Sequence, residues 1–187
     1  AEAVLVLAEQ LRVPITYEDP PFESNDDLVA VFPGSGTLIP KGAHISFQYR
    51  VSAAPRETIS SMLDKHNSTG KGGTFRSERS EGVYSVIPSH YRNSSGEATP
   101  FRSPLDIPLT LGTGGRSCSD VLQLVFLSIA KRDSRFRIEK GRVPRALERM
   151  PYSSSGIDGE SARKILNRIL AQCNLSLGND DRRFTWQ

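Results

Sequence analysis

Histidine, cysteine and an activated serine are the residues that most often carry catalysis or bind metals, and their spacing in a sequence indicates whether they can do so together. The three histidines stand at positions 44, 66 and 90, and no two of them have the four-residue spacing of helix-borne metal ligands. Two cysteines do not make a four-ligand zinc site by themselves. No Gly-x-Ser-x-Gly motif marks a nucleophilic serine. We therefore expect no metal site, no cofactor and no catalytic residues.

The two cysteines, Cys118 and Cys173, leave two structural alternatives open. An even number of cysteines allows one disulfide, which an oxidising compartment would favour. In the other alternative each cysteine packs separately as a small apolar side chain. Cys118 stands close to an expected helix start, where a thiolate is stabilised, but no histidine is near it in the sequence to act as a base.

A glycine-rich turn precedes the expected helix in the second half of the chain. Backbone amides at a helix start bind phosphate well, and an arginine in the turn would add positive charge. The turn lacks the lysine and the spacing of a nucleotide-binding loop, so a plain turn is favoured. Binding of an anionic or phosphorylated ligand is kept as the alternative function, and its candidate residues are Gly112, Gly114, Gly115, Arg116 and Ser117.

An aromatic and acidic cluster with two prolines stands at the exit of the first expected strand. Loops of this kind present side chains to partners on a rigid backbone. The cluster is therefore a candidate partner contact, although a turn that happens to be acidic is the simpler interpretation. Its candidate residues are Tyr17, Glu18, Asp19 and Phe22.

Charge is distributed unevenly along a chain whose formal net charge is only +3. Residues 1–30 hold seven acidic residues and one arginine, whereas residues 131–149 hold eight basic residues and three acidic ones. Such asymmetry can steer a complementary protein surface, although a solvated face is the commoner explanation. Nucleic-acid binding is not expected, because the basic stretch offers only Phe136 as an aromatic side chain for stacking.

The composition is that of a folded chain without a membrane span. The chain has 187 residues, of which 37% are hydrophobic and 24% charged, so it can bury a core. Its longest apolar stretch, residues 121–130, is too short for the roughly 20 residues that cross a bilayer and holds Gln123 and Ser128. The chain begins at Ala1 within an apolar periodic segment, which suggests an upstream segment such as a signal peptide.

Hydrophobic periodicity predicts most of the elements. In the first half we expect helices over residues 2–11 and from Pro55 to the glycines at 70–73, strands at 13–17 and 45–51, a short strand at 28–32, and a hairpin that turns at Glu81-Gly82. In the second half we expect strands at 109–111, 136–138 and from 175 to 186, and helices over 119–130 and from 162. The helix over 119–130 is apolar on most of its circumference, which predicts that it is the most buried.

The two halves follow a similar order, which predicts an internal duplication. A shift of 106 residues places Val51 on Ile157 and Ile59 on Ile165. We therefore expect an α+β fold of two related helix-strand-strand-helix-strand-strand units, with small mixed or antiparallel sheets. The boundaries are a first unit at 1–92 with a long inserted loop at 18–43, a linker at 93–104, and a second unit at 105–187.

In the first half, an expected helix leads into a strand over residues 6–17, and the strand at 47–51, the helix at 54–63 and the hairpin through 86–88 follow. In the sequence of segment 6–17 and in this order of elements, the first half resembles the secretin and TonB short N-terminal (STN) domains. The resemblance covers residues 1–88 and, more faintly, residues 117–187. The chain differs from the family in two respects. The loop at 18–43 stands where the family has a short linker between its first two strands, and no barrel or plug sequence follows.

The resemblance implies a non-enzymatic module of the bacterial envelope that docks other proteins, and it supplies no catalytic residues. We therefore expect a periplasmic or secreted interaction protein whose partner is an envelope protein or polymer. Exposed sheet edges would allow this protein to pair with a partner strand or to form an oligomer.

Overall fold

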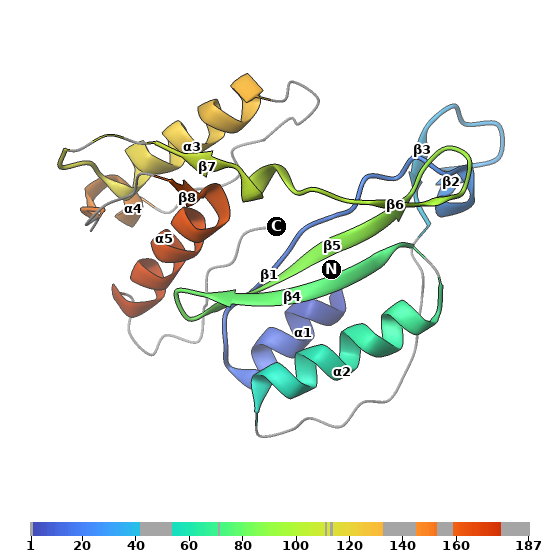
Figure 1. Ribbon diagram of the computed structural model, residues 1–187, viewed down its shortest axis with the longest axis horizontal. Coiled ribbons are helices and arrows are strands. Elements are labelled where there is room, and N and C mark those ends of the chain that lie inside the picture. Colours follow the sequence, from blue (N-terminus) through green and yellow to red (C-terminus); the bar gives the residue numbers. More distant parts are fainter. Residues whose placement is uncertain are drawn as a thin grey trace. The chain divides into compact units, whose positions relative to one another are not determined.

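The computed structural model of the chain describes residues 2–41, 54–70, 72–110, 112, 114–132, 145–152 and 159–176 (Figure 1). Helices and small mixed or antiparallel sheets make up these residues, so the expected α+β class is confirmed. Contacts divide the chain into two compact units. Of the described residues, the first unit comprises 2–41, 54–70, 72–79 and 84–102, and the second comprises 80–83, 103–110, 112, 114–132, 145–152 and 159–176.

The described part of the first unit contains two α-helices, one 3₁₀ helix and most of the strands. In chain order the elements are α1 (Glu2–Leu11), β1 (Ile15–Tyr17), the 3₁₀ helix η1 (Asn25–Asp27), β2 (Leu28–Ala30), β3 (Leu38–Pro40), α2 (Pro55–Ser68), β4 (Thr74–Ser80), β5 (Val83–Arg92) and β6 (Ala98–Pro100). The predictions of α1, β1, α2 and the β4–β5 hairpin are confirmed. The expected strand at 45–51 lies outside the described residues.

The main sheet of this unit has the order β1-β5-β4, with β6 paired to the far end of β5. β1 runs parallel to β5, with Ile15 opposite Tyr84, and β6 runs antiparallel to it, with His90 opposite Pro100. Helices α1 and α2 both lie against one face of the sheet (Figure 1). Their apolar faces pack on the strands in a core formed by Val4, Leu7, Ile15, Ile59, Met62, Leu63, Phe75, Tyr84 and Val86.

A two-residue turn joins β4 to β5. Both of its central residues have positive φ angles, 52° at Glu81 and 78° at Gly82. That combination defines a type I′ turn, whose twist matches the right-handed twist of the flanking strands. The hairpin predicted from Glu81-Gly82 therefore forms where the sequence placed it.

The long loop expected at 18–43 contains a second small sheet. β2 and β3 pair antiparallel, with Leu28 opposite Pro40, Val29 opposite Ile39 and Ala30 opposite Leu38. The short strand expected at 28–32 is confirmed as β2, but its partner β3 was not predicted. Apolar residues on both strands pair across a turn rich in proline and glycine, and this pairing makes a hairpin out of the expected loop.

The linker prediction needs a correction. Residues 98–100, inside the expected linker at 93–104, form β6 and extend the sheet of the first unit. The turn before β6 is held by the side chain of Asn93, whose Oδ1 accepts from the N–H groups of Ser95 and Glu97, each at 3.0 Å. The chain passes into the second unit after Arg102. The Asn-Ser-Ser-Gly sequence therefore marks a strand turn and not a domain linker.

The second unit contains the 3₁₀ helix η2 (Pro104–Asp106), β7 (Pro108–Leu109), α3 (Cys118–Arg132), α4 (Ala146–Arg149), β8 (Glu160–Ser161) and α5 (Ala162–Ser176). β7 and β8 pair antiparallel. The helices expected over 119–130 and from 162 are confirmed as α3 and α5. α4 was not predicted, and Leu175, expected in a strand, lies in α5 because the helical apolar spacing continues to Cys173.

Helix α5, and not α3, is the more buried helix. On α3 only Cys118, Val121, Val125 and Ile129 are buried, and Leu127 is 59% exposed. The prediction that α3 is the most buried helix was therefore wrong, because an apolar circumference is buried only where a neighbour covers it. On α5 two buried polar side chains, Arg163 and Asn167, accompany the apolar ones.

The internal duplication remains a prediction. Its expected strands at 45–51, 136–138 and 184–186 all lie outside the described residues. Among the helices of the described residues, none is long and apolar enough to cross a bilayer.

Candidate functional site

The glycine-rich turn before α3 is closed by the protein's own groups. Ser117 Oγ accepts from the N–H of Asp120 (3.1 Å), and Asp120 Oδ2 accepts from both the N–H (3.1 Å) and the hydroxyl (2.7 Å) of Ser117. The N–H of Cys118 donates to the carbonyl of Met150 (2.8 Å). The hydrogen bonds from Ser117 lower the pKa of the Asp120 carboxyl. The anion at this helix start is therefore the chain's own carboxylate.

The other residues of this turn do not form a cradle. Gly112, Gly114 and Gly115 are exposed, and Arg116 is half-buried with its carbonyl accepting from the N–H of Tyr152 (2.8 Å). Since the side chain of Asp120 already occupies the helix start, no observation favours an external anion there.

The cluster expected to contact a partner is mostly built into the first unit. Tyr17 stacks on Phe75 with ring centroids 5.6 Å apart, and burial, with the nearby carboxylate of Asp19, raises its pKa. Glu18 is buried, and its N–H donates to the carbonyl of Val86 (3.1 Å), which continues the pairing of β1 with β5. Asp19 is exposed and Phe22 is half-buried. Tyr17 and Glu18 thus support the sheet and present little surface to a partner.

Both cysteines are free and buried in the structure. Cys118 on α3 lies beside α5, where its thiol donates to Oε1 of Gln172 (3.3 Å). Burial, with Cys173 nearby, raises the pKa of Cys118 to about 11, and burial also raises the pKa of Cys173. A buried thiol with a raised pKa is a poor nucleophile, and both side chains pack here as small apolar groups.

The histidines lie apart from one another. His66 is half-buried against Phe75, with ring centroids 5.2 Å apart, and burial lowers its pKa. His90 is exposed, with Nδ1 3.2 Å from Oγ1 of Thr74. His44 lies outside the described residues, as do residues 133–144 of the basic stretch. Within the described ranges, no three His, Cys, Asp or Glu side chains gather as metal ligands would.

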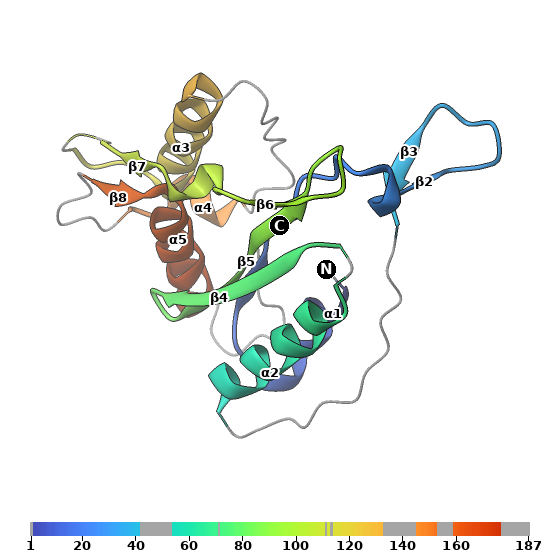
Figure 2. The same cartoon turned by 45° about the vertical axis from the view of Figure 1, so that its right-hand side comes forward.

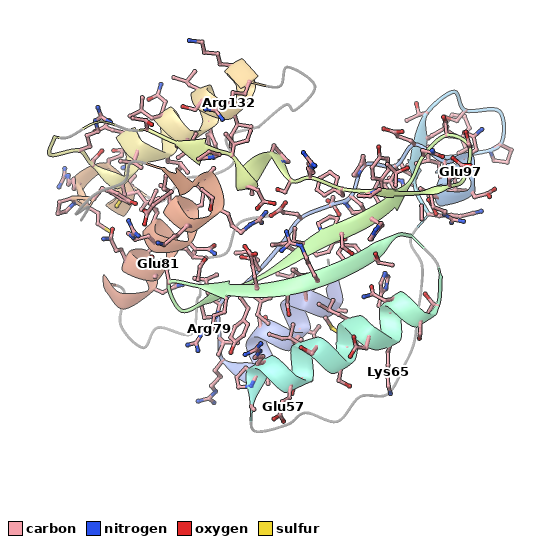
Figure 3. All side chains as sticks on the ribbon, in the orientation of Figure 1. Glu57, Lys65, Arg79, Glu81, Glu97 and Arg132 are labelled. Carbon is pink, nitrogen blue, oxygen red and sulfur yellow. The ribbon has the colours of Figure 1, made fainter. Side chains whose placement is uncertain are left out.

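A hollow of about 470 Å³ opens beside the first turn of α2. It is lined by Arg56, Ser77, Glu78, Arg79 and Tyr84. Arg79, labelled in Figure 3 at the end of β4, has its guanidinium carbon 5.4 Å from the centre of the Tyr84 ring. Because both arginines are exposed to solvent, the hollow is an open surface feature, and we assign it no ligand.

Five of the eight large apolar side chains that are exposed among the described residues lie on the β2–β3 hairpin. Residues 28–40 contain no Asp, Glu, Lys, Arg or His. Its large apolar side chains face solvent, with exposed fractions of 42% for Val29, 51% for Val31, 63% for Phe32, 51% for Leu38 and 45% for Ile39. Figure 2 shows the hairpin extending away from the main sheet of the first unit and its two helices. A group of exposed apolar side chains of this kind is typical of an interaction site.

An ion pair fixes the base of this hairpin to the main sheet. Asp27, at the start of the hairpin, has a buried carboxylate that accepts two hydrogen bonds from Arg92 at the end of β5, one of them from Nε at 3.1 Å. Ser24 caps the short helix η1 just before it, accepting from the N–H of Asp26 (3.3 Å). A bidentate arginine–carboxylate pair restricts both partners, so the hairpin leaves the sheet at a fixed point.

Sequence reasoning missed this surface because it treated residues 18–43 as a loop. The available signal was the run of residues 28–40 without charge, flanked by Asp27 and Lys41. An uncharged run with two short apolar segments around Pro33-Gly34 is typical of a hairpin, and its exposure could be seen only in the fold.

Comparisons of the chain with protein-family models, with curated proteins and with solved structures find no match.

Proposed function

We propose that this chain is a non-enzymatic protein-interaction module that binds a protein partner through its β2–β3 hairpin. The observation that carries the proposal is the exposure of five large apolar side chains on one uncharged hairpin. An isolated two-stranded hairpin is at best marginally stable in water, so an exposed apolar hairpin gains stability from a covering surface.

The anchoring of the hairpin supports the same function. The ion pair between Asp27 and Arg92 orders the hairpin before any partner binds, and preorganisation of this kind lowers the entropy cost of binding. The partner expected from this chemistry is a protein with an apolar, uncharged surface or an open strand edge. The resemblance to envelope docking domains also supports an interaction role, and from it we propose a periplasmic or secreted location.

Site-specific photo-crosslinking tests the proposal. The full chain is produced in its own host with benzoylphenylalanine at Phe32 and, as a matched control, at Glu57, which is exposed in the first turn of α2 (Figure 3). We expect one reproducible protein adduct from position 32 and none from position 57, and we expect Val31→Asp to abolish that adduct. Equal labelling from both positions, or none from either, would refute the proposed function.

Cell fractionation tests the location separately. Recovery of the chain in the periplasmic or secreted fraction supports it, whereas recovery with the cytoplasmic fraction contradicts it. The crosslinking result does not depend on which fraction holds the protein.

A further inference from the structure

We infer that the partner of the β2–β3 hairpin is a second copy of this chain, whose β2 pairs antiparallel with β2 to make a four-stranded sheet. The inference rests on the proposed function, because it names the occupant of the same surface. The backbone groups at the edge of β2, the side chains beside them and the opposite edge of the hairpin support it.

The hydrogen bonds across the hairpin define which backbone groups face outward. The N–H of Val31 donates to the carbonyl of Thr37 (3.1 Å), and the N–H of Lys41 donates to the carbonyl of Asp27 (2.7 Å). Positions 27, 29 and 31 therefore face β3, because alternate residues of an antiparallel strand bond to the same neighbour. Leu28, Ala30 and Phe32 direct their N–H and C=O groups to the outer edge.

Two of these outward groups already have partners within the hairpin. The N–H of Leu28 donates to the carbonyl of Asn25, and the carbonyl of Phe32 accepts from the N–H of Ser35 (2.9 Å). Within the described part of the chain, four groups remain open at this edge: the carbonyl of Leu28, the N–H and carbonyl of Ala30, and the N–H of Phe32.

These four groups can hydrogen-bond to the same four groups of a second chain related by a two-fold axis. With Ala30 opposite Ala30 of the second copy, the two alanines exchange both of their hydrogen bonds. The same register places Phe32 opposite the second copy's Leu28, so that the open N–H of one meets the open carbonyl of the other. Every open donor then bonds one open acceptor. The N–H of Leu28 and the carbonyl of Phe32, which already have partners within the hairpin, take no part in the interface.

The side chains of β2 also match in this register. Val29 falls opposite Val31 of the second copy in a non-hydrogen-bonded pair, the arrangement in which cross-strand side chains approach most closely. On the other face Leu28 meets Phe32. Because residues 28–40 carry no charge, no like charges oppose each other across the two-fold axis.

The opposite edge of the hairpin limits the assembly to two copies. Leu38 and Pro40 are the outward positions of β3, since their partners Ala30 and Leu28 are the outward positions of β2. Proline has no N–H to donate, so it blocks strand addition at that edge. One open edge and one blocked edge give a closed dimer, whereas two open edges would give a filament.

Analytical ultracentrifugation of the full chain over a range of concentrations tests the inference. We expect a monomer–dimer equilibrium and no larger species. Ala30→Pro removes the central donor of the proposed interface without touching a bond to β3, and we expect it to raise the dimer Kd about tenfold or more. Leu38→Pro, the matched control, removes the outward donor of the other edge and should leave the dimer Kd unchanged.

A cysteine variant tests the same interface if Ala30→Pro fails to fold, because it reports the dimer by forming a covalent bond. Ala30→Cys should form a disulfide-linked dimer on mild oxidation, because directly opposed residues of a hydrogen-bonded pair have Cα atoms about 5.5 Å apart. Leu38→Cys should remain monomeric on a denaturing gel. The native cysteines are buried and give little background.

The outcomes separate this inference from the proposed function. A chain that is monomeric at all concentrations, with a Phe32 adduct to a different protein, overturns the second copy as partner and leaves the proposed function standing. Monomeric chain with no adduct refutes both. Hairpin-dependent binding to phosphatidylcholine–phosphatidylglycerol vesicles by a chain that stays monomeric would replace the second copy with a lipid surface.

Discussion

Gly73 is the position where a single side chain would disturb the first unit most directly. Its φ is +83°, and a Cβ there would lie 2.5 Å from the carbonyl oxygen of His90 on the neighbouring strand β5. The left-handed conformation alone costs an L-residue about 1–2 kcal/mol, and the contact with rigid backbone adds to that.

We therefore predict that Gly73→Ala lowers the free energy of unfolding by more than about 2 kcal/mol, measured by urea denaturation. Gly72→Ala is the matched control, because Gly72 has a φ of +67° but no atom within 4 Å of a Cβ. Gly72→Ala should lower the free energy of unfolding by only about 1 kcal/mol. Equal losses from the two variants would show that the close approach to β5 contributes nothing.

The thiols allow a second test at the residue scale. Because Cys118 and Cys173 are buried and the pKa of Cys118 is raised to about 11, neither is expected to react with Ellman's reagent in the folded protein at pH 8. After denaturation without reductant, two thiols per chain should react. Denatured protein with no reactive thiol would mean that the two cysteines form a disulfide when the protein is made.

At the scale of elements, the ion pair between Asp27 and Arg92 connects the hairpin to the main sheet. Asp27 has 8% of its side chain exposed and Arg92 has 27%, so removing Arg92 leaves a buried carboxylate without its partner. We predict that Arg92→Gln lowers the free energy of unfolding by about 1–3 kcal/mol and speeds proteolysis within residues 28–40. Arg102→Gln, at an exposed site, is the control and should change neither quantity.

A cluster of charges connects the elements of the second unit. Arg168 on α5 bonds Glu160 of β8 (2.8 Å) and Glu81 (2.9 Å), and Lys164 pairs with the same Glu160 (2.7 Å). Hydrogen bonds from Arg168 and then Lys164 lower the pKa of Glu160 below its ordinary value of 4.5, although burial opposes them. The cluster holds β8 and the tip of the β4–β5 hairpin to α5.

This pKa shift predicts a pH dependence of stability with a definite sign. A carboxyl whose pKa is lower in the folded than in the unfolded state stabilises the fold when it is ionised. This contribution is complete at a pH above the pKa of the unfolded state, and it is lost as the pH falls through the pKa of the folded state. The free energy of unfolding should therefore fall below about pH 4.5, with a slope from this residue of up to about 1.4 kcal/mol per pH unit. Glu160→Gln should flatten that part of the curve, and Glu97→Gln should not.

At the scale of the whole molecule, most large apolar side chains of the described residues are buried, and most of the exposed ones lie on the hairpin. Both units bury apolar side chains, among them Ile59 in the first and Ile165 in the second, while the hairpin presents valine, leucine, isoleucine and phenylalanine to solvent. An exposed side chain contributes little to folding, so Phe32 can be changed without loss of the fold. We expect Phe32 to contribute instead to the free energy of self-association.

We therefore predict that Phe32→Ser changes the free energy of unfolding by no more than about 0.5 kcal/mol while it weakens self-association. Ile59→Ser, in the core, is the contrasting variant and should cost several kcal/mol. Loss of stability with Phe32→Ser comparable to that of Ile59→Ser would show that the hairpin is part of a core.

The sequence alone determined the local elements. Apolar spacing of three and four residues predicted α1, α2, α3 and α5, and Glu81-Gly82 predicted a hairpin, because these features depend on neighbours within a few residues. The capping of α3 is local in the same sense, because Ser117 bonds Asp120 only three residues further on.

Only the tertiary structure decided which apolar surface is covered. It put one face of α3 in a core and left Leu127 exposed, built β6 into the sheet where the sequence suggested a linker, and turned the uncharged stretch at 28–40 into an exposed hairpin. Burial depends on contacts between residues far apart in the sequence, such as Asp27 with Arg92 and Cys118 with Gln172. Local periodicity carries no information about such contacts, and for that reason the candidate site emerged from the fold.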